Sequence, residues 1–527
     1  MELRVVAVSA PEWPDGRPNP QVLTSADPVS LFNACRVAAV SSSDVNSPWA
    51  DSNWAGERKV RRANVLLLHS ADSEHLSSLE KLLLGEKPNL LLIGAMSLCL
   101  PGAVACARLA RAILGNDVLI VLGGRHVNET FFLDRLGMIR HHPASPLVLT
   151  AAKLIPDLFD IFVSGDGEYV IEAIGRLVVR TLKQGLEVRC AANSLEMLRL
   201  APGRWLAGTV LEGKIRQVAS SGPNLDRDTL PPPVSVFGAR AKFDVFPGRI
   251  TAHAFSDSGS GCVFDCDFCS ERRSVSGPPI GLTKSARRLH RQLKAAYSAI
   301  SEDTPEMGIS AFVEDSTLLG GSEPPTQELV KLLSTDSLDM IFGAQYTIDQ
   351  ILRQKNLITA LRNVGLRYLF VGLETFDPAQ VGGMHKDLSR TPWVQRAEDV
   401  FSFLHAAGIG CGVAILFGLG ENQISRLRLL DQLATWRTRY DLPRPISLNW
   451  AVKHPLRERD RETGYRYLKW GTPSGPYVEA FRNFAEASLN YCLPGKSPPT
   501  LDELEEINAA YQFATDERSE HECLSAP

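Results

Sequence analysis

Two stretches of this chain alternate short β-rich runs with amphipathic helical segments, and this alternation restricts the possible fold more than any other feature. In the first stretch the apolar runs are Val5–Val8, Val65–Leu68, Leu90–Ile93, Val118–Leu122 and Ile161–Val163. The alternation restarts near Thr251, with strands predicted at Ile250–Ala254, Ile309–Val313, Met340–Tyr346, Leu369–Glu374 and Gly412–Gly418. Such repeats are typical of parallel sheets covered by helices. We therefore expect an α/β fold, with a Rossmann-like doubly wound sheet followed by a partial (β/α)6 barrel.

Changes in composition suggest how the chain is divided. The segment 18–59 is rich in Ser, Pro, Asn and Ala, and we expect a long insertion or partly helical excursion after the first strand. Trp205–Ile215 resembles a short hairpin, and Pro231-Pro232-Pro233 forms a stiff connection because proline fixes φ. The predicted division is a Rossmann-like domain at 1–175, a linker at 176–248, a barrel at 249–440, and a helical C-terminal domain at 441–527 with a disordered tail from Asp516.

Composition also restricts the class of protein. The chain has 527 residues, 44% hydrophobic and 22% charged, which are the proportions of a globular protein. A formal net charge of −4 gives no general attraction to nucleic acid or to anionic membranes. The first residues lack the pattern of a signal peptide, and no apolar run reaches the roughly 18 residues that a membrane-spanning helix needs. We expect a cytoplasmic monomer without nucleic-acid or membrane partners.

Three cysteines form the most distinctive motif. Cys262, Cys266 and Cys269 are spaced C-x3-C-x2-C, and Phe268 precedes the last of them. Soft thiolates favour zinc or iron–sulfur clusters. A closed zinc site needs four ligands, and no second C-x2-C or nearby His pair supplies the fourth. The alternatives are a zinc site that lacks a partner, three free thiols, or an iron–sulfur cluster with one iron open to a substrate.

The spacing, together with Phe268, resembles the signature of the radical S-adenosylmethionine (SAM) enzymes. The resemblance implies a [4Fe-4S] cluster held by the three cysteines, with SAM chelated by the open iron through its amino and carboxylate groups. It also implies an external electron donor of the flavodoxin or ferredoxin type. The other seven cysteines are expected to tolerate substitution.

Later strand ends resemble further parts of the radical SAM core. Glu314 and Asp315 lie where the family contacts the methionyl amino group, although the usual Gly-Gly-Glu is absent. Gly372-Leu373-Glu374-Thr375 resembles the Gly-x-Glu-Ser loop, which implies that Glu374 contacts SAM. The segment 414–421 resembles the adenine-contact element, and the residues implied are Ala414, Leu416, Gly418 and Glu421. For Glu421 there is an equal alternative to ligand contact: it precedes a predicted helix, and its negative charge can interact favourably with the helix N-terminus.

The first domain resembles the cobalamin-binding domain of one radical SAM class. The matching residues at its strand ends are Ser97, Gly123, Gly124, Gly165, Gly167 and Glu168. The Asp-x-His-x-x-Gly motif that supplies a lower-axial histidine in many cobalamin domains is missing after Val8. We therefore expect cobalamin without a histidine ligand, and His69 and His126 are the nearby candidates against this expectation.

The whole resemblance implies a methyltransferase that uses SAM and methylcobalamin to methylate an unactivated carbon of a small molecule or natural-product intermediate. The alternative with the same cofactors is ring contraction, cyclisation or another rearrangement. A regulatory module without catalysis belongs to a different class. Methylthiolation of RNA is disfavoured, because no second three-cysteine set and no basic RNA-binding appendage are evident.

Overall fold

The computed structural model describes residues 2–11, 29–68, 73–134, 136–238, 242–259, 261–266, 268–376, 391–451 and 499–515. Along the chain, the boundary between two compact units lies between Ala241 and Lys242. No helix within the described ranges is long and apolar enough to cross a membrane. The predicted disordered tail from Asp516 lies outside these ranges.

The first unit is built on a sheet with the strand order β2-β1-β3-β4-β7-β8-β9. Its strands are β1 (Val5–Ser9), β2 (Val65–Leu67), β3 (Leu90–Gly94), β4 (Leu119–Gly123), β7 (Ile161–Gly165), β8 (Trp205–Leu211) and β9 (Lys214–Ala219). Strands β2, β1, β3, β4 and β7 are parallel, whereas β8 is antiparallel to β7 and β9 is antiparallel to β8. This confirms the predicted doubly wound sheet. The strand order reverses between β1 and β3, where such sheets bind ligands.

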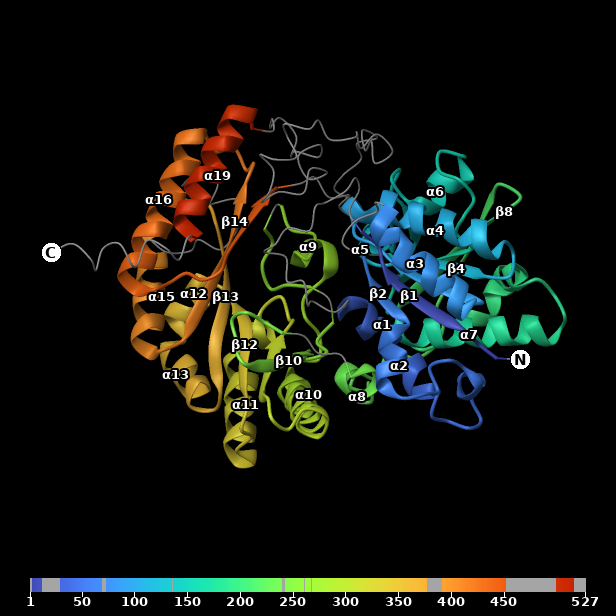
Figure 1. Ribbon diagram of the computed structural model, residues 1–527, viewed down its shortest axis with the longest axis horizontal. Helices are drawn as coiled ribbons and strands as arrows, with labels where there is room; N and C mark the ends of the chain where they lie inside the picture. The colour runs from blue at the N-terminus through green and yellow to red at the C-terminus, as the bar shows by residue number, and fades with distance from the viewer. Residues whose placement is uncertain are drawn as a thin grey trace. The chain divides into compact units, whose positions relative to one another are not determined.

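Helices cover both faces of this sheet. Helix α1 (Val29–Ser41) packs against α7 (Glu168–Lys183), and a second pair is formed by α3 (Ser73–Glu86) and α4 (Leu100–Leu114) (Figure 1). Consecutive residues of β1, β3, β4 and β7 are buried, as expected for strands covered on both sides. The shorter elements are η1 (Pro48–Asp51), α2 (Arg58–Ala63), η2 (Ser97–Cys99), α5 (Arg125–Thr130), β5 (Phe131–Leu133), β6 (Ile139–His141), α6 (Pro146–Ala151), η3 (Val188–Leu198) and α8 (Pro233–Phe237).

The segment 18–59 is helical where it is described, as expected in part, but it belongs to the core. Trp49 and Trp54 are fully buried. The indole N–H of Trp49 donates to the carbonyl of Glu172 on α7 at 2.9 Å. A Cβ atom on Gly175 would lie 2.3 Å from the Trp49 ring, so the glycine makes room for it. The low hydrophobicity of the segment concealed both tryptophans: Trp49 attaches it to α7, and Trp54 packs against Trp49 and Phe237.

The predicted linker at 176–248 is wrong, because residues up to 238 are part of the first unit. Helix α7 continues across the predicted boundary at 175. The predicted hairpin is confirmed as β8 and β9: β8 pairs with β7, and β9 is the edge strand of the sheet. Trp205, Leu206 and Ala207 are buried there, so the hairpin is needed to complete the core.

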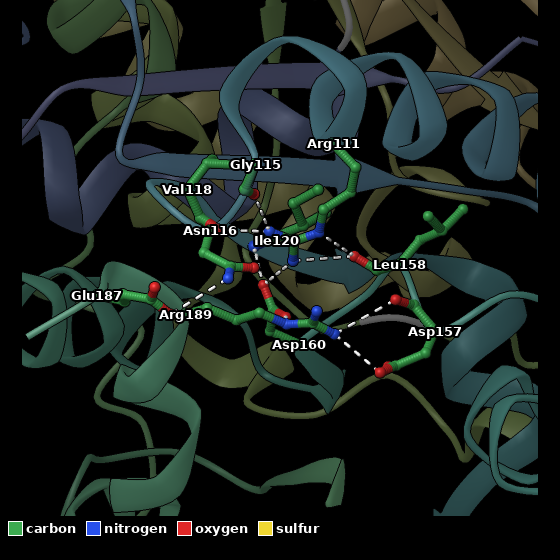
Figure 2. Close-up of polar contacts among 10 residues, drawn as sticks. All are labelled: Arg111, Gly115, Asn116, Val118, Ile120, Asp157, Leu158, Asp160, Glu187 and Arg189. Atoms are coloured by element: carbon green, nitrogen blue, oxygen red, sulfur yellow. Dashed lines mark hydrogen bonds and ion pairs between the residues drawn. The ribbon is translucent and has the colours of Figure 1, made fainter.

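A buried carboxylate joins the amino ends of β4 and β7 (Figure 2). Asp160 accepts hydrogen bonds from the N–H of Ile120 at 2.7 Å and from Nε of Arg189 at 2.8 Å, and it also pairs with Arg111. Its side chain is 1% exposed. This cluster lies at the strand edge opposite to the carboxyl ends, so its role is to stabilise the sheet.

The second unit contains a six-stranded parallel sheet in which the strands follow the order of the chain. Its strands are β10 (Arg249–Ala254), β11 (Gly308–Val313), β12 (Ile341–Tyr346), β13 (Leu366–Glu374), β14 (Gly410–Phe417) and β15 (Ile446–Trp450). Sequential parallel strands joined by helices make a partial (β/α)6 barrel, as expected.

Helices connect the strands of this unit, and Figure 1 shows α13, α15 and α16 together on one side of the strands. The helices of this unit are α9 (Arg273–Ser276), α10 (Leu282–Asp303), η4 (Leu318–Gly321), α11 (Glu323–Asp336), α12 (Ile348–Arg353), α13 (Lys355–Asn363), α15 (Trp393–Ala407), α16 (Gln423–Tyr440) and α19 (Leu501–Thr515). The predicted barrel boundary at 440 is wrong, because β15 pairs with β14 beyond it. Helix α19 packs on α16, and the Tyr511 hydroxyl donates to the carbonyl of Ile446 at 2.7 Å.

Candidate active site

The three predicted cluster cysteines lie in one loop between β10 and α9. Cys266 is buried, Cys262 and Cys269 are partly exposed, and none of them forms a disulfide. Phe268 is also partly exposed. The loop therefore brings three cysteine side chains to the carboxyl edge of the parallel sheet, which is the functional edge of barrel-type folds.

The backbone around these cysteines is closely held. Gly261 has a φ of +134°, and a Cβ atom there would lie 2.2 Å from the carbonyl oxygen of Gly277, so the position requires glycine. The N–H of Arg273 donates to the carbonyl of Phe264 at 2.8 Å, and the N–H of Phe264 lies 3.5 Å from Cys262 Sγ. Within the described ranges, no three His, Cys, Asp or Glu side chains are placed to hold a single metal ion. The thiolates of a [4Fe-4S] cluster each bind a different iron, and the three-thiol donor set fits that group.

The predicted adenine-contact residues Ala414 and Leu416 lie on the face of the sheet that the helices leave open. Along β14, alternate residues are buried, whereas Ala414 and Leu416 are partly exposed. The strand register places Gly372 of β13 and Ser447 of β15 on either side of Ala414. Side chains on this row are small, so a flat ligand can approach the backbone.

Glu314 and Asp315 follow β11 but have different surroundings. The Glu314 side chain is 24% exposed, and its Oε1 accepts a hydrogen bond from Nδ1 of His253 at 2.5 Å. Asp315 Oδ1 accepts from the N–H of Ser256 at 2.9 Å, and its Oδ2 is buried. Burial raises the pKa of Asp315 to about 6. Glu314 is thus the carboxylate that a ligand can reach, while Asp315 ties together the segments that follow β10 and β11.

Glu374 ends β13 in a strained conformation. Its φ of +58° is uncommon for a residue other than glycine. The N–H of Thr375 donates to the carbonyl of Leu373 at 2.9 Å, which closes a three-residue turn around Glu374. The indole N–H of Trp393 donates to the same carbonyl at 3.2 Å. Backbone strain of this kind clusters at functional sites, so it favours the predicted role of Glu374.

Glu421 is enclosed by its own loop. Its Oε1 accepts from the N–H of Gly418 at 2.6 Å and from Nε of Arg426 at 2.9 Å. Its Oε2 accepts from the N–H groups of Leu419 and Gly420 at 2.9 and 3.1 Å. The side chain is 1% exposed. Glu421 therefore shapes the loop that contains Gly418, and its carboxylate is already occupied by protein donors.

In the first unit, the predicted cobalamin residues lie where β3, β4 and β7 end. Gly124 has a φ of +96°, and a Cβ atom there would lie 2.6 Å from the backbone nitrogen of Ala95. Gly165 has a φ of +91°, and its Cβ atom would lie 2.3 Å from the carbonyl oxygen of Arg204. Gly123 and Gly167 have room for a Cβ atom, with nearest atoms at 3.6 and 3.5 Å. Their lack of a side chain is not needed for folding.

Ser97 and Glu168 make internal contacts instead of facing the strand edge. Ser97 is 4% exposed, with its Oγ 3.1 Å from Nδ1 of His126 and 3.3 Å from a carboxylate oxygen of Glu129. Glu168 is 7% exposed and lies 3.7 Å from the guanidinium of Arg36. Burial raises the pKa of Glu168, and Arg36 opposes this shift.

His126 is fully buried, and its second ring nitrogen, Nε2, lies 3.1 Å from the carbonyl oxygen of Ala144. Both ring nitrogens are thus hydrogen-bonded within the protein. His69, the other candidate ligand, lies outside the described residues.

Residues 257–433 match the family model of the radical SAM superfamily. The match includes the cysteine loop, Glu314, Glu374 and the Gly418 loop. This segment is a radical SAM domain. The chain is also 22% identical over 374 residues to the anaerobic magnesium-protoporphyrin IX monomethyl ester cyclase of Rubrivivax gelatinosus. The alignment covers 67% of this chain and 57% of the cyclase.

Two solved structures are similar over most of this chain. One is the radical SAM methyltransferase TsrM from Kitasatospora setae with cobalamin and a [4Fe-4S] cluster bound, at 13% identity and a TM-score of 0.48, covering 86% of this chain and 72% of TsrM. The other is the cobalamin-dependent SAM radical enzyme OxsB with aqua-cobalamin and SAM bound, at 14% identity and a TM-score of 0.49. That alignment covers 83% of this chain and 55% of OxsB.

Three residues near the site of the radical SAM domain were not predicted from the sequence. They are His253 on β10, Arg426 on α16 and Trp450 on β15, with the Arg426 guanidinium 4.9 Å from the centre of the Trp450 ring. His253 follows Thr251 at the period of two that marks one face of a strand, and this pattern was the available signal. Arg426 and Trp450 are brought together only by the pairing of β14 with β15.

Proposed function

We propose that the chain is a cobalamin-dependent radical SAM methyltransferase that methylates an unactivated carbon of a small-molecule or natural-product intermediate. The observation that carries this proposal is a loop with three cysteines, none of them in a disulfide, at the carboxyl edge of a parallel sheet. At the same edge, Glu314 follows β11 with a ligand-accessible carboxylate, and Glu374 ends β13 with a strained backbone.

Each part of the site has a role in this reaction. The thiolates of Cys262, Cys266 and Cys269 would hold the cluster. Glu314 and Glu374 would orient the polar groups of SAM, and Ala414 and Leu416 would line its adenine. When bound, the cluster supplies the electron that cleaves SAM, and cobalamin supplies a carrier for the methyl group. The protein contributes orientation and exclusion of water.

A corrinoid site in the first unit is supported by its strand order and by its glycines. The strand order reverses between β1 and β3, and sheets of this kind bind ligands at the carboxyl edge beside such a reversal. Gly123 and Gly167 leave space at this edge that folding does not require. His126 is buried and both of its ring nitrogens are hydrogen-bonded within the protein, which supports cobalamin without a histidine ligand. Ser97 and Glu168 would shape the loops around the corrinoid through their internal contacts.

The similarity to a cyclase favours a second candidate, in which the same cofactors drive ring formation or another rearrangement without methyl transfer. Either reaction would use a small-molecule substrate and a reductant of the flavodoxin or ferredoxin type. SAM with a labelled methyl carbon distinguishes them. A product that retains the label supports methyl transfer, and an unlabelled isomer or oxidised product supports the alternative.

The first experiment needs no substrate. Protein purified and reconstituted without oxygen is expected to contain iron, sulfide and corrinoid, and to release 5′-deoxyadenosine from SAM. Changing Cys262, Cys266 or Cys269 to Ala should abolish the cluster and SAM cleavage, because each thiolate holds one iron. Cys190→Ala is the matched control, because Cys190 is partly exposed and lies in η3, outside the cysteine loop. Reconstituted protein without corrinoid would overturn the assignment of the first unit.

A further inference from the structure

We propose that His253 is a positioning residue for Glu314, and that this pair presents the carboxylate that receives the methionyl ammonium group of SAM. The inference rests on the proposed function, since it takes SAM as the ligand of the open face. His253 lies near the end of β10, and Glu314 directly follows β11. These two strands are neighbours in parallel register, so their ends meet at the same edge.

The hydrogen bond between the two side chains is short and sheltered. Nδ1 of His253 donates to Oε1 of Glu314 at 2.5 Å, and the histidine is 5% exposed. Hydrogen bonds to ionised acceptors are shorter and stronger than neutral ones. The ring of Phe243 packs edge-on against the imidazole, with centroids 5.8 Å apart. The imidazole is thereby held in place, and it holds one carboxylate oxygen in turn.

Two atoms of the pair remain open to a ligand. Among the described residues, His253 makes the one hydrogen bond to the Glu314 carboxylate, which leaves Oε2 for a cation. Nε2 of His253 is buried and has no hydrogen-bond partner within the described part of the chain. A buried polar atom without a partner costs free energy, so a bound ligand or water is expected to complete this position.

A second polar pair joins the same two strands and serves as a structural comparison. Thr251 and Ser310 lie deeper on this face, with their hydroxyl oxygens 2.9 Å apart, and both residues are 0% exposed. This pair has no access to a ligand. It therefore serves as a control for a cross-strand contact that supports the structure but does not contact the ligand.

The test compares SAM with an analogue that lacks the ammonium group, together with the rest of the amino acid part and the sulfonium charge. 5′-Methylthioadenosine shares the adenosine part of SAM but lacks its amino acid part. In the full-length, anaerobically reconstituted protein, His253→Ala is expected to weaken SAM binding about tenfold, the cost of one hydrogen bond to a charged group. Binding of 5′-methylthioadenosine should be unchanged. His253→Asn places an amide donor near the position of Nδ1 and should restore most of the SAM affinity.

Two further variants complete the test. Thr251→Val is expected to leave the ratio of the two affinities unchanged. In a Glu314→Gln background, His253→Ala should cause no additional loss, because the two residues act as a unit. Equal weakening of both ligands, or unchanged SAM binding in His253→Ala, would overturn the positioning role. Wild-type protein that fails to bind SAM would overturn both proposals, whereas SAM cleavage without methylated product would overturn methyl transfer alone.

Discussion

The carboxyl group of Asp315 combines a backbone hydrogen bond at one oxygen with burial of the other. Burial raises its pKa from 3.8 to about 6. A raised pKa means that the folded protein binds this proton more tightly than the unfolded chain does. The stabilisation is therefore fully present below about pH 4 and is lost as the pH rises through about 6.

Asp315→Asn removes this titration, because an amide stays neutral. We expect the stability of the variant relative to wild type to rise by about 2 kcal/mol between pH 4 and pH 7. Urea unfolding of the full-length chain at several pH values measures the difference. A difference that does not change with pH would show that Asp315 keeps an ordinary pKa.

Glu314 and Asp315 also illustrate what a sequence leaves open at this scale. Their position after an apolar run predicted two carboxylates at a strand end. Which one meets His253 and which one meets Ser256 depends on where neighbouring strands place their side chains, and no local pattern encodes this. Glu421 was equally ambiguous, since three backbone N–H groups reach its carboxylate only after the Gly418 loop has folded.

At the scale of elements, apolar runs located the strands well, because buried parallel strands are nearly continuous in hydrophobic residues. Strand β15 was missed because Ser447 and Asn449 interrupt its apolar residues on the open face. The hairpin of β8 and β9 and the strand β7 were each predicted, but the pairing of β8 with β7 was not. Pairing between distant segments depends on the whole sheet.

Substitutions at Gly123 and Gly124 distinguish a glycine that is needed for folding from one that leaves room for a ligand. Gly124→Ala should destabilise the first unit, because its φ is positive and its Cβ atom would meet Ala95. Gly123→Ala has room in the protein and should leave thermal stability unchanged. If the corrinoid approaches this edge, Gly123→Ala will nevertheless lower the corrinoid content after reconstitution. Full corrinoid content in a stable Gly123→Ala variant would argue against a close approach there.

The Asp160 cluster fastens β4 and β7 at their amino ends (Figure 2). Asp160→Ala leaves Arg111 and Arg189 without their shared buried carboxylate, and we expect a loss of about 3 kcal/mol in unfolding free energy. Asp157→Ala is the matched control. It removes a carboxylate that is 59% exposed and bonded to the same Arg189, and it should cost less than about 1 kcal/mol. Similar losses for both variants would contradict the importance of burial.

At the scale of the whole molecule, the boundary at Ala241 makes a direct prediction about fragments. A fragment ending at residue 175 cuts α7 and lacks the hairpin that buries Trp205, so it should not fold. A fragment ending at residue 241 keeps these elements and should fold cooperatively. Circular dichroism and limited proteolysis compare the two. A stable fragment ending at 175 would restore the predicted domain boundary.

The cysteine loop also has a consequence for biogenesis. All three thiols lie between Cys262 and Cys269 in the loop after β10, whereas the proposed SAM contacts lie in or directly after β11, β13 and β14. During synthesis, the chain completes its iron-binding loop before it has made the strands that hold SAM. We expect cluster insertion to be possible on a chain that cannot yet cover the open iron. Oxygen exposure during production should then damage newly made protein more than mature protein with SAM bound.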